Sequence, residues 1–289
     1  MRLIYLLMGF SFVFAAEYNF APKVIEDDKE LPIVVMIASY NNVSVFKRNL
    51  DTLFSQDYSN YRVLYTDDAS TDGTYAGVVR YIEERGLKDK IIVFRNDENR
   101  KAMYNQYNMV HKCKDHEIVF TYDGDDWLPD NTVFKRLNQA YLDKKVWMTF
   151  GNNIKWPSGE KGTSEAVETE ILKNGEHRKI LFGPFTQPRT FYAGLFKSIP
   201  MHLFMKDGKF FDIGHDVAIM YYLMDLCREH TFFIPEVNYV YNVANPINDF
   251  KVDVRKQLMN EYYIKRKPPL KKLSEEEFLK LTANKYLRD

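Results

Sequence analysis

The chain has 289 residues, of which 45% are hydrophobic and 28% are charged, and 40 Lys and Arg residues balance 40 Asp and Glu residues. This is the composition of a globular protein with enough apolar mass for one large domain or two halves. The absence of a basic excess argues against a nucleic-acid partner, and two cysteines exclude a disulfide-rich scaffold.

The N-terminus predicts a targeting segment. Arg2 precedes an apolar run over residues 3–14, and the small residues Ala15 and Ala16 follow it. This is the pattern of a secretory signal peptide, and the run is short for a membrane span. We therefore expect a signal peptide at 1–16, a linker at 17–31 and no stable membrane span after cleavage; a short signal anchor is the alternative.

Residues 32–151 alternate between strand and helix patterns. Continuous apolar runs predict strands at 33–39, 61–66, 90–96, 117–123 and 146–151. Stripes of apolar residues predict helices after the first, second and fourth strands, and a polar helix is expected across 101–112 after the third. Gly86 stands where a helix C-cap belongs. This order predicts an α/β fold with a doubly wound, mostly parallel sheet and helices on both faces.

Polar clusters follow three of these strands, at residues 39–42, 66–74 and 123–126. Ligands of such sheets bind beyond the carboxyl ends of the strands, so these clusters are expected to converge. Neither a G-x-G-x-x-G fingerprint nor a P-loop is present, which disfavours dinucleotide oxidoreductases and P-loop ATPases.

The cluster at 123–126 holds three carboxylates, Asp123, Asp125 and Asp126. Close carboxylates are tolerated where a divalent cation neutralises them, and Mg²⁺ or Mn²⁺ often takes one or two carboxylates together with substrate phosphates. The alternative is a solvated acidic turn in which Asp130 caps the next helix. Asp67 and Asp72 are expected to brace a turn and to cap the following helix.

Three linked stretches, "VVMIASYNN", "FSQDYSNYRVLYTDDASTDGT" and "VFTYDGDDWLPD", resemble the family 2 glycosyltransferases of the GT-A fold. The resemblance covers about residues 32–151, which would form the nucleotide-sugar-binding half. It implies a nucleotide-sugar donor, usually a UDP-sugar, a divalent metal (Mn²⁺ or Mg²⁺) and inversion at the anomeric carbon.

The resemblance also implies roles for individual residues. Ser39 and Tyr40 would border the nucleobase, and Asp68 would accept a hydrogen bond from uracil. Asp123 would contact the ribose or a metal-bound water, Asp125 would be the main metal ligand, and Asp126 would orient or share the metal. Further donor contacts are expected from Gly124 and from Lys101 or Arg100. Trp127 is expected to pack under the acidic loop.

The second half, 152–249, would bind the acceptor, and 250–289 would form a helical tail with a capping box from Ser274 to Glu277. Asp216 begins an apolar-striped helix and matches the family's catalytic base, although an N-cap role suits it too. His215 replaces a glutamate of the family, and Asn242 or Asn245 stands where relatives often have a metal-binding histidine. The aromatic stretch 182–199 is a further acceptor-side candidate.

The sequence therefore predicts a metal-dependent, inverting glycosyltransferase that moves a single sugar to a hydroxyl of a protein or glycan. The signature of processive synthases, Q-x-x-R-W, is missing, which favours single transfer. A catalytically inactive GT-A-like carbohydrate- or nucleotide-binding protein, a sugar nucleotidyltransferase and a metal-dependent phosphohydrolase are the alternatives. The expected location is the secretory lumen or the exterior, or the cytoplasm if the N-terminal segment is not a working signal.

Overall fold

The computed structural model describes residues 29–143, 145–180, 185–246 and 253–282. The expected signal peptide and most of the expected linker lie outside these ranges, so both stay predictions. Among the helices of the described ranges, none combines the length and the apolar character that a membrane span requires.

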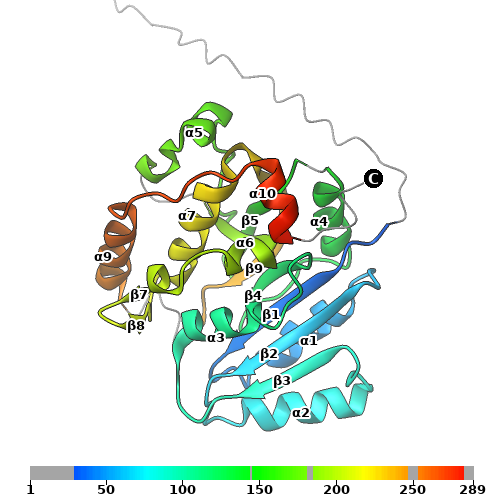
Figure 1. Ribbon diagram of the computed structural model, residues 1–289. Coiled ribbons are helices and arrows are strands. Elements are labelled where there is room, and N and C mark those ends of the chain that lie inside the picture. The colour runs from blue at the N-terminus through cyan, green and yellow to red at the C-terminus, as the bar shows by residue number, and fades with distance from the viewer. Residues whose placement is uncertain (1–28, 144, 181–184, 247–252, 283–289) are drawn as a thin grey trace, which may run out of the picture.

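A seven-stranded sheet forms the centre of the protein, in the order β3-β2-β1-β4-β6-β5-β9 (Figure 1). Its strands are β1 (Ile33–Ser39), β2 (Tyr61–Asp67), β3 (Ile91–Arg95), β4 (Ile118–Asp123), β5 (Met148–Trp156), β6 (Thr186–Tyr192) and β9 (Thr231–Asn242). β6 pairs antiparallel with β4 and β5, whereas the other neighbouring pairs are parallel. The predicted α/β fold with a mostly parallel sheet is therefore confirmed, with one antiparallel strand inserted into it.

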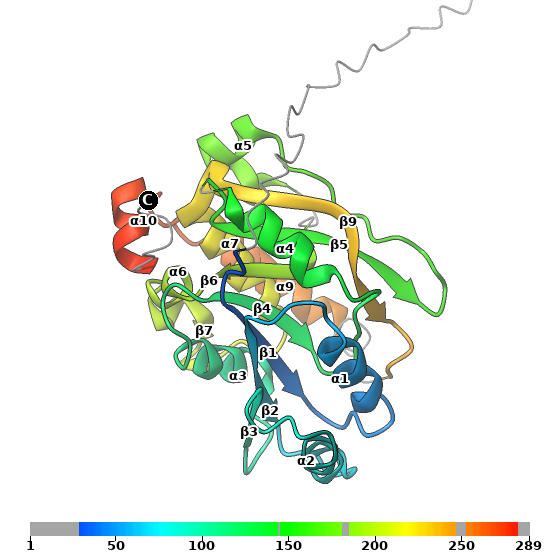
Figure 2. The ribbon, with the colours of Figure 1, turned by 90° about the vertical axis from the view of Figure 1, so that its right-hand side faces the viewer.

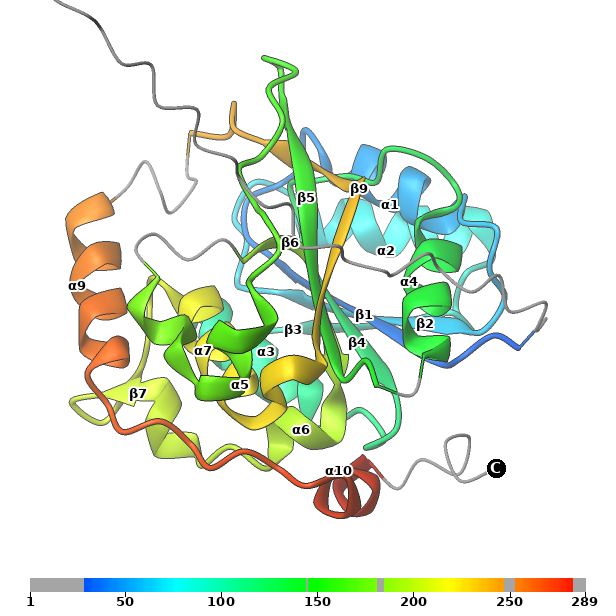
Figure 3. The same cartoon turned by 90° about the horizontal axis from the view of Figure 1, so that it is seen from above.

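Helices cover both faces of this sheet, as the alternating pattern predicted (Figures 2 and 3). One face carries α1 (Phe46–Phe54), α2 (Thr74–Arg85) and α4 (Val133–Leu142), and the other carries α3 (Lys101–Val110), α6 (Ala193–Lys197) and α7 (His215–Cys227). The remaining elements are α5 (Thr169–Asn174), η1 (Glu176–Lys179), η2 (Met201–Phe204), the hairpin of β7 (Met205–Lys206) and β8 (Lys209–Phe210), η3 (Arg228–His230), α9 (Val254–Lys265) and α10 (Glu275–Thr282).

Local signals set several of these boundaries. Gly86 ends α2 with a left-handed φ of 64°, which confirms the predicted C-cap. The capping box is also confirmed, because Ser274 N donates to Glu277 Oε2 at 2.7 Å and Glu277 N donates to Ser274 Oγ at 3.1 Å. β5, however, continues past the predicted end at 151 to Trp156. The polar Asn152 and Asn153 interrupt the apolar run there, yet both are buried in the strand.

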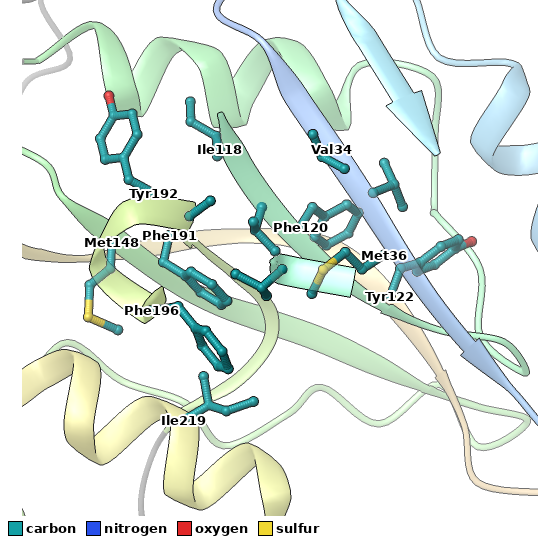
Figure 4. Packing of buried hydrophobic residues seen from close by; sticks show 14 of the residues in the cluster. Val34, Met36, Ile118, Phe120, Tyr122, Met148, Phe191, Tyr192, Phe196 and Ile219 are labelled. Atoms are coloured by element: carbon teal, nitrogen blue, oxygen red, sulfur yellow. The ribbon is translucent and has the colours of Figure 1, made fainter. Parts of the chain in front are cut away.

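The core lies on both sides of β4 and β6 (Figure 4). Phe120 packs edge-on against Phe134 of α4, with ring centroids 5.9 Å apart. Phe191 of β6 stacks on Phe196 of α6 at 5.8 Å. The density of aromatic residues in 182–199 is thus explained, over its described part, by core packing around the inserted strand β6.

A buried ion cluster joins α7 to the C-terminal segment. The Asp225 carboxylate lies 3.0 Å from His177 Nε2 and accepts hydrogen bonds from the Arg178 guanidinium. It also accepts the backbone N–H of Leu270 at 2.9 Å. Arg178 in turn donates to the carbonyl of Ile264 at 2.8 Å, so the cluster fastens the end of α9 to the core. Neither Asp225 nor His177 is exposed.

Candidate active site

The three polar clusters predicted at strand ends meet at one edge of the sheet. In the parallel register Ser39 pairs with Asp67 and Ala38 pairs with Asp123. Asp68 N donates to the Ser39 carbonyl at 2.8 Å, which ties the second cluster to the first. The predicted convergence is therefore confirmed, and the reason is that β2, β1 and β4 are neighbours and end together.

Gly124 permits the close approach of the first and third clusters. A Cβ atom added at this position would lie 2.7 Å from Cβ and Oγ of Ser39 and 2.9 Å from Nδ2 of Asn42. Since real Cβ atoms essentially never come so near, any larger residue would push the acidic loop away from the end of β1. Ser39 itself is buried at this contact and Tyr40 is half-buried.

The acidic residues that end β2 hold their own loop. Asp67 Oδ2 accepts the backbone N–H of Ser70 at 3.1 Å, so Asp67 braces the turn as expected. Asp72 accepts the backbone N–H groups of Thr74 and Val43, both at 2.9 Å. Burial raises the pKa of Asp72, but the hydrogen bond from the Thr74 hydroxyl, together with these two from the backbone, outweighs it, so the pKa lies below its usual value. The N-cap of α2 is Gly73, one residue after Asp72.

Asp68 organises the loop between β3 and α3. Its Oδ1 accepts hydrogen bonds from Asn96 Nδ2 at 2.7 Å and from Arg100 N at 2.8 Å, and its Oδ2 accepts from Lys101 N at 2.8 Å. Lys101 reaches this position with a positive φ of 69°. Since a carboxylate offers about four acceptor positions, these three hydrogen bonds occupy most of them, and Asp68 is buried.

The three carboxylates of the acidic loop occupy different environments. Asp123 Oδ2 accepts from Gln187 Nε2 at 3.1 Å, and Asp125 Oδ2 accepts from Asn245 Nδ2 at 2.6 Å; both residues are partly exposed. Asp126 is fully buried, and its Oδ1 accepts the backbone N–H of Asn242 at 2.7 Å. Burial, followed by the charges of Asp125 and Asp123, raises the pKa of Asp126 well above its usual value.

The three carboxylates of the loop therefore do not form a ready-made metal site by themselves. Within the described ranges, no group of three or more His, Cys, Asp and Glu residues is arranged to hold a metal ion. Asp123 and Asp125 are partly exposed, and this suits carboxylates that would share a metal ion with a bound diphosphate. Asp126 instead connects the loop to the end of β9.

The end of β9 and the turn after it supply the amide groups, Asn242 and Asn245, that the sequence suggested in place of a histidine. Asn245 contacts the carboxylate of Asp125, and Asn242 Nδ2 donates to the Asp125 carbonyl at 3.2 Å. Trp127 packs beneath the loop as expected, with 4% of its surface exposed and the Arg48 guanidinium 3.6 Å from its ring centroid.

The predicted base, Asp216, lies in the first turn of α7. The N-cap is Gly214, with a φ of 77°, so the alternative N-cap role for Asp216 is wrong. Arg189 Nη2 lies 2.7 Å from Asp216 Oδ2, and 24% of the Asp216 side chain is exposed. Burial raises the pKa of Asp216, but the charges of Arg189 and then His215 outweigh it, so the carboxyl pKa is lowered and the group is ionised at neutral pH.

β6 connects the acidic loop to this carboxylate. Gln187 and Arg189 stand two residues apart on β6. Gln187 contacts Asp123 and Arg189 contacts Asp216. Neither Gln187 nor Arg189 was predicted to belong to the site. No local signal marks them, because the polar residues of "TQPRTFY" do not alternate regularly with apolar ones.

Comparisons with known proteins agree with this arrangement. The profile of a family described as "Glycosyl transferase family 2" matches residues 34–207, more than half of the chain. EpsE of Bacillus subtilis (strain 168), named as a glycosyltransferase, is 27% identical over 115 residues. That match covers 39% of this chain and 38% of EpsE, so the chain matches well under half of that relative's length.

Two solved structures share the fold. The mannosyltransferase PcManGT from Pyrobaculum calidifontis, in complex with GDP-Man and Mn²⁺, superimposes with a TM-score of 0.57 at 18% identity, covering 90% of this chain and 70% of that one. S. aureus TarS 1–349, in complex with UDP-GlcNAc, gives a TM-score of 0.57 at 12% identity, covering 88% of this chain and 71% of that one.

Proposed function

The chain belongs to glycosyltransferase family 2, and from this premise we propose that it transfers a single sugar from a UDP-sugar to a hydroxyl of a protein or glycan, with inversion. The observation that carries the proposal is the pairing made by β6. Gln187 of this strand donates to Asp123 of the acidic loop, and Arg189 donates to Asp216 of α7. One short strand segment thus contacts both the carboxylate that would meet the donor and the carboxylate that would act as base, which suits a direct displacement.

Asp125 and Asp123 would hold Mn²⁺ or Mg²⁺ together with the donor diphosphate. Asn245 and Gln187 each donate to one of these carboxylates, which fixes the direction of the remaining oxygen lone pairs. When bound, the ion would offset the negative charge that builds up on the diphosphate as it leaves. Asp126 would support the site from below by fixing the loop against β9.

The nucleoside would lie along the ends of β1 and β2. Ser39 and Tyr40 would border the base, and the remaining acceptor position of Asp68 would take a hydrogen bond from it. Gly124 would let the acidic loop approach closely enough for one ligand to contact both clusters. Lys101, placed at the start of α3 by its bond to Asp68, would contribute a cation near the phosphates.

Asp216 would act as the general base. An inverting transfer requires a carboxylate that accepts the proton of the acceptor hydroxyl while its oxygen attacks the anomeric carbon. The transition state has oxocarbenium character, and the diphosphate leaves from the opposite face. Arg189 keeps Asp216 ionised and donates to its Oδ2, so Oδ1, which accepts the backbone N–H of Val217, would receive the proton.

A donor screen tests this proposal. The purified protein is incubated with a panel of UDP- and GDP-sugars, with Mn²⁺, with Mg²⁺ or with EDTA, and nucleotide release is measured. We expect metal-dependent release from one donor. Asp125→Asn should weaken metal-dependent donor binding, whereas Asp216→Asn should keep donor binding and lower turnover by about 10²–10⁴-fold.

Asp57→Asn is a matched control, because Asp57 is an exposed carboxylate paired only with Lys135 at the surface among the ion pairs of the described ranges. It should match the wild type in both assays. Metal-dependent donor binding without turnover, even with acceptors supplied, would favour the inactive binding protein. An Asp216→Asn variant with unchanged turnover would remove Asp216 from the role of base.

A further inference from the structure

The outer side of α9 carries a stripe of exposed apolar residues. Val254, Leu258, Met259 and Tyr262 are 40%, 47%, 54% and 61% exposed, and their spacing places them on one side of the helix. The other side is anchored, because Ile264 is buried and Asn260 Nδ2 donates to the Ile213 carbonyl at 2.9 Å. Four large apolar side chains are thus left together at the rim of the protein (Figures 1 and 3).

Cationic side chains surround this stripe. Two adjoining surface hollows are lined by the stripe, by Tyr263 and by four cations, Lys206, Arg255, Arg266 and Lys267, with no acidic residue in either lining. Lys206, from the β7–β8 hairpin, and Lys267 lie 5.2 and 4.4 Å from the ring of Tyr263. The hairpin and α9 therefore form one surface, which we name the α9 face.

The charge of this region contrasts with the neutral chain as a whole. Residues 254–272 contain seven Lys and Arg residues and one acidic residue, Glu261. Three of the cations are neutralised in ion pairs, Lys256 with Asp212, Lys265 with Glu261 and Lys272 with Glu229. Arg255, Arg266 and Lys267 form no ion pair within the described ranges, and all three line the α9 face.

We propose that the α9 face docks onto the surface of an anionic lipid membrane. Apolar side chains that point outward between cations, with tyrosine among them, suit an interface where the acyl region takes the apolar groups and lipid phosphates take the cations. A second copy of this chain fits less well, because self-association would place like charges opposite one another. An acidic peptide would satisfy the cations but does not require the long apolar stripe.

Docking here would bring the membrane close to the acceptor side of the site. Asn260 of α9 is bonded to Ile213, which stands three positions before Asp216. The docking proposal does not depend on catalysis, because vesicle binding is measured without a sugar donor.

The test is sedimentation of the full-length protein with two kinds of vesicle. One kind contains phosphatidylcholine alone, and in the other about a third of the lipid is phosphatidylglycerol, which gives the vesicle a negative surface potential. We expect binding to the anionic vesicles only, weakening as salt is raised. Leu258→Ser/Met259→Ser should abolish most of it. Arg266→Glu and Lys267→Glu should each lower binding by at least about fivefold, which corresponds to loss of one cation near the surface.

Ile92→Ser and Lys173→Glu are the matched controls, since they alter an exposed apolar residue and an exposed cation away from α9. Both should bind as the wild type does. Equal binding to neutral vesicles, equal loss in the controls, or no binding to anionic vesicles by folded protein would overturn the proposal. So would displacement by soluble polyglutamate at the same charge concentration as the lipid, which would assign the face to an acidic peptide.

Discussion

The replacement Asp225→Asn tests the buried ion cluster that fastens the C-terminal segment to α7. Asparagine keeps the size of the side chain but removes the charge that faces Arg178, whose side chain is 8% exposed. Arg178 retains its hydrogen bonds to the carbonyls of Ile264 and Lys267, at 2.8 and 3.2 Å. The variant loses the ion pair between Asp225 and Arg178. It also loses at least one of the hydrogen bonds that the two carboxylate oxygens of Asp225 accept.

The expected cost is about 3–5 kcal/mol, because breaking a buried pair leaves its other charge uncompensated. That is a large fraction of the roughly 5–15 kcal/mol by which a folded domain is stable. At roughly 2–4 °C per kcal/mol, it corresponds to a fall in melting temperature of about 10 °C. Urea unfolding and thermal melting, both followed by circular dichroism, measure it.

The effect should depend on pH with a defined sign. Burial raises the pKa of Asp225, but its hydrogen bonds to His177 and Arg178 outweigh this and lower the pKa below the unfolded value. The stabilisation is therefore fully present above the unfolded pKa of about 3.9 and is lost as pH falls through the native pKa. The gap between wild type and Asp225→Asn should be constant from neutral pH down to about pH 5 and should shrink below about pH 4.

Asp212→Asn provides the comparison, because it breaks the exposed pair with Lys256, whose partners are 40% and 45% exposed. Its cost should be at most about 1 kcal/mol. The reasoning fails if Asp225→Asn is no more destabilised than this control. It also fails if the gap between variant and wild type widens toward acid.

Three further predictions concern the active site. Gly124→Ala places a methyl group 2.7 Å from the Ser39 side chain; it should cost about 1–3 kcal/mol and weaken nucleotide binding by calorimetry, and adding Ser39→Gly should recover part of the loss. Asp126→Asn removes a carboxyl whose pKa is raised by burial and by the charges of Asp125 and Asp123, so its ionisation lowers the stability of the folded state as pH rises. In urea unfolding at pH 7 the variant should be at least as stable as the wild type. A clear loss of stability would contradict the buried environment of Asp126. Arg189→Gln removes the main counter-charge of the partly buried Asp216, which raises the pKa of this carboxyl. The acidic limb of kcat/KM should therefore move to higher pH, and an unmoved limb would mean that Asp216 does not control that limb.

Much of the fold was predictable because its signals are local. The apolar runs of β1, β2 and β4 and the stripes between them identify the strands and helices within windows of about ten residues. Parallel strands joined by helices end on the same edge of their sheet, so chain order predicts that Ser39, Asp68 and Asp123 lie along one edge. Gly86 and the pair Ser274 and Glu277 set helix ends for equally local reasons.

The site was less predictable where its contacts join distant parts of the chain. Asp125 meets Asn245, and Asp123 meets Gln187, across separations of 120 and 64 residues. No local sequence pattern marks either pair, because many polar residues could form these hydrogen bonds. The sequence does not distinguish Asp126 from its neighbour Asp125. Asp126 is nevertheless buried, and the end of β9 packs against it through the backbone N–H of Asn242.

The sequence by itself determined the α/β order, the three polar clusters at strand ends and the carboxylates that we propose to contact the nucleotide-sugar donor. Only the tertiary structure decided that β6 enters the sheet antiparallel between β4 and β5, and so brings Gln187 to Asp123 and Arg189 to Asp216. The physical reason is that the two kinds of information act over different distances along the chain. Periodicity records which face of an element is buried, whereas the choice of neighbouring strand depends on how whole layers pack, and that choice sets the partner and the pKa of each carboxylate.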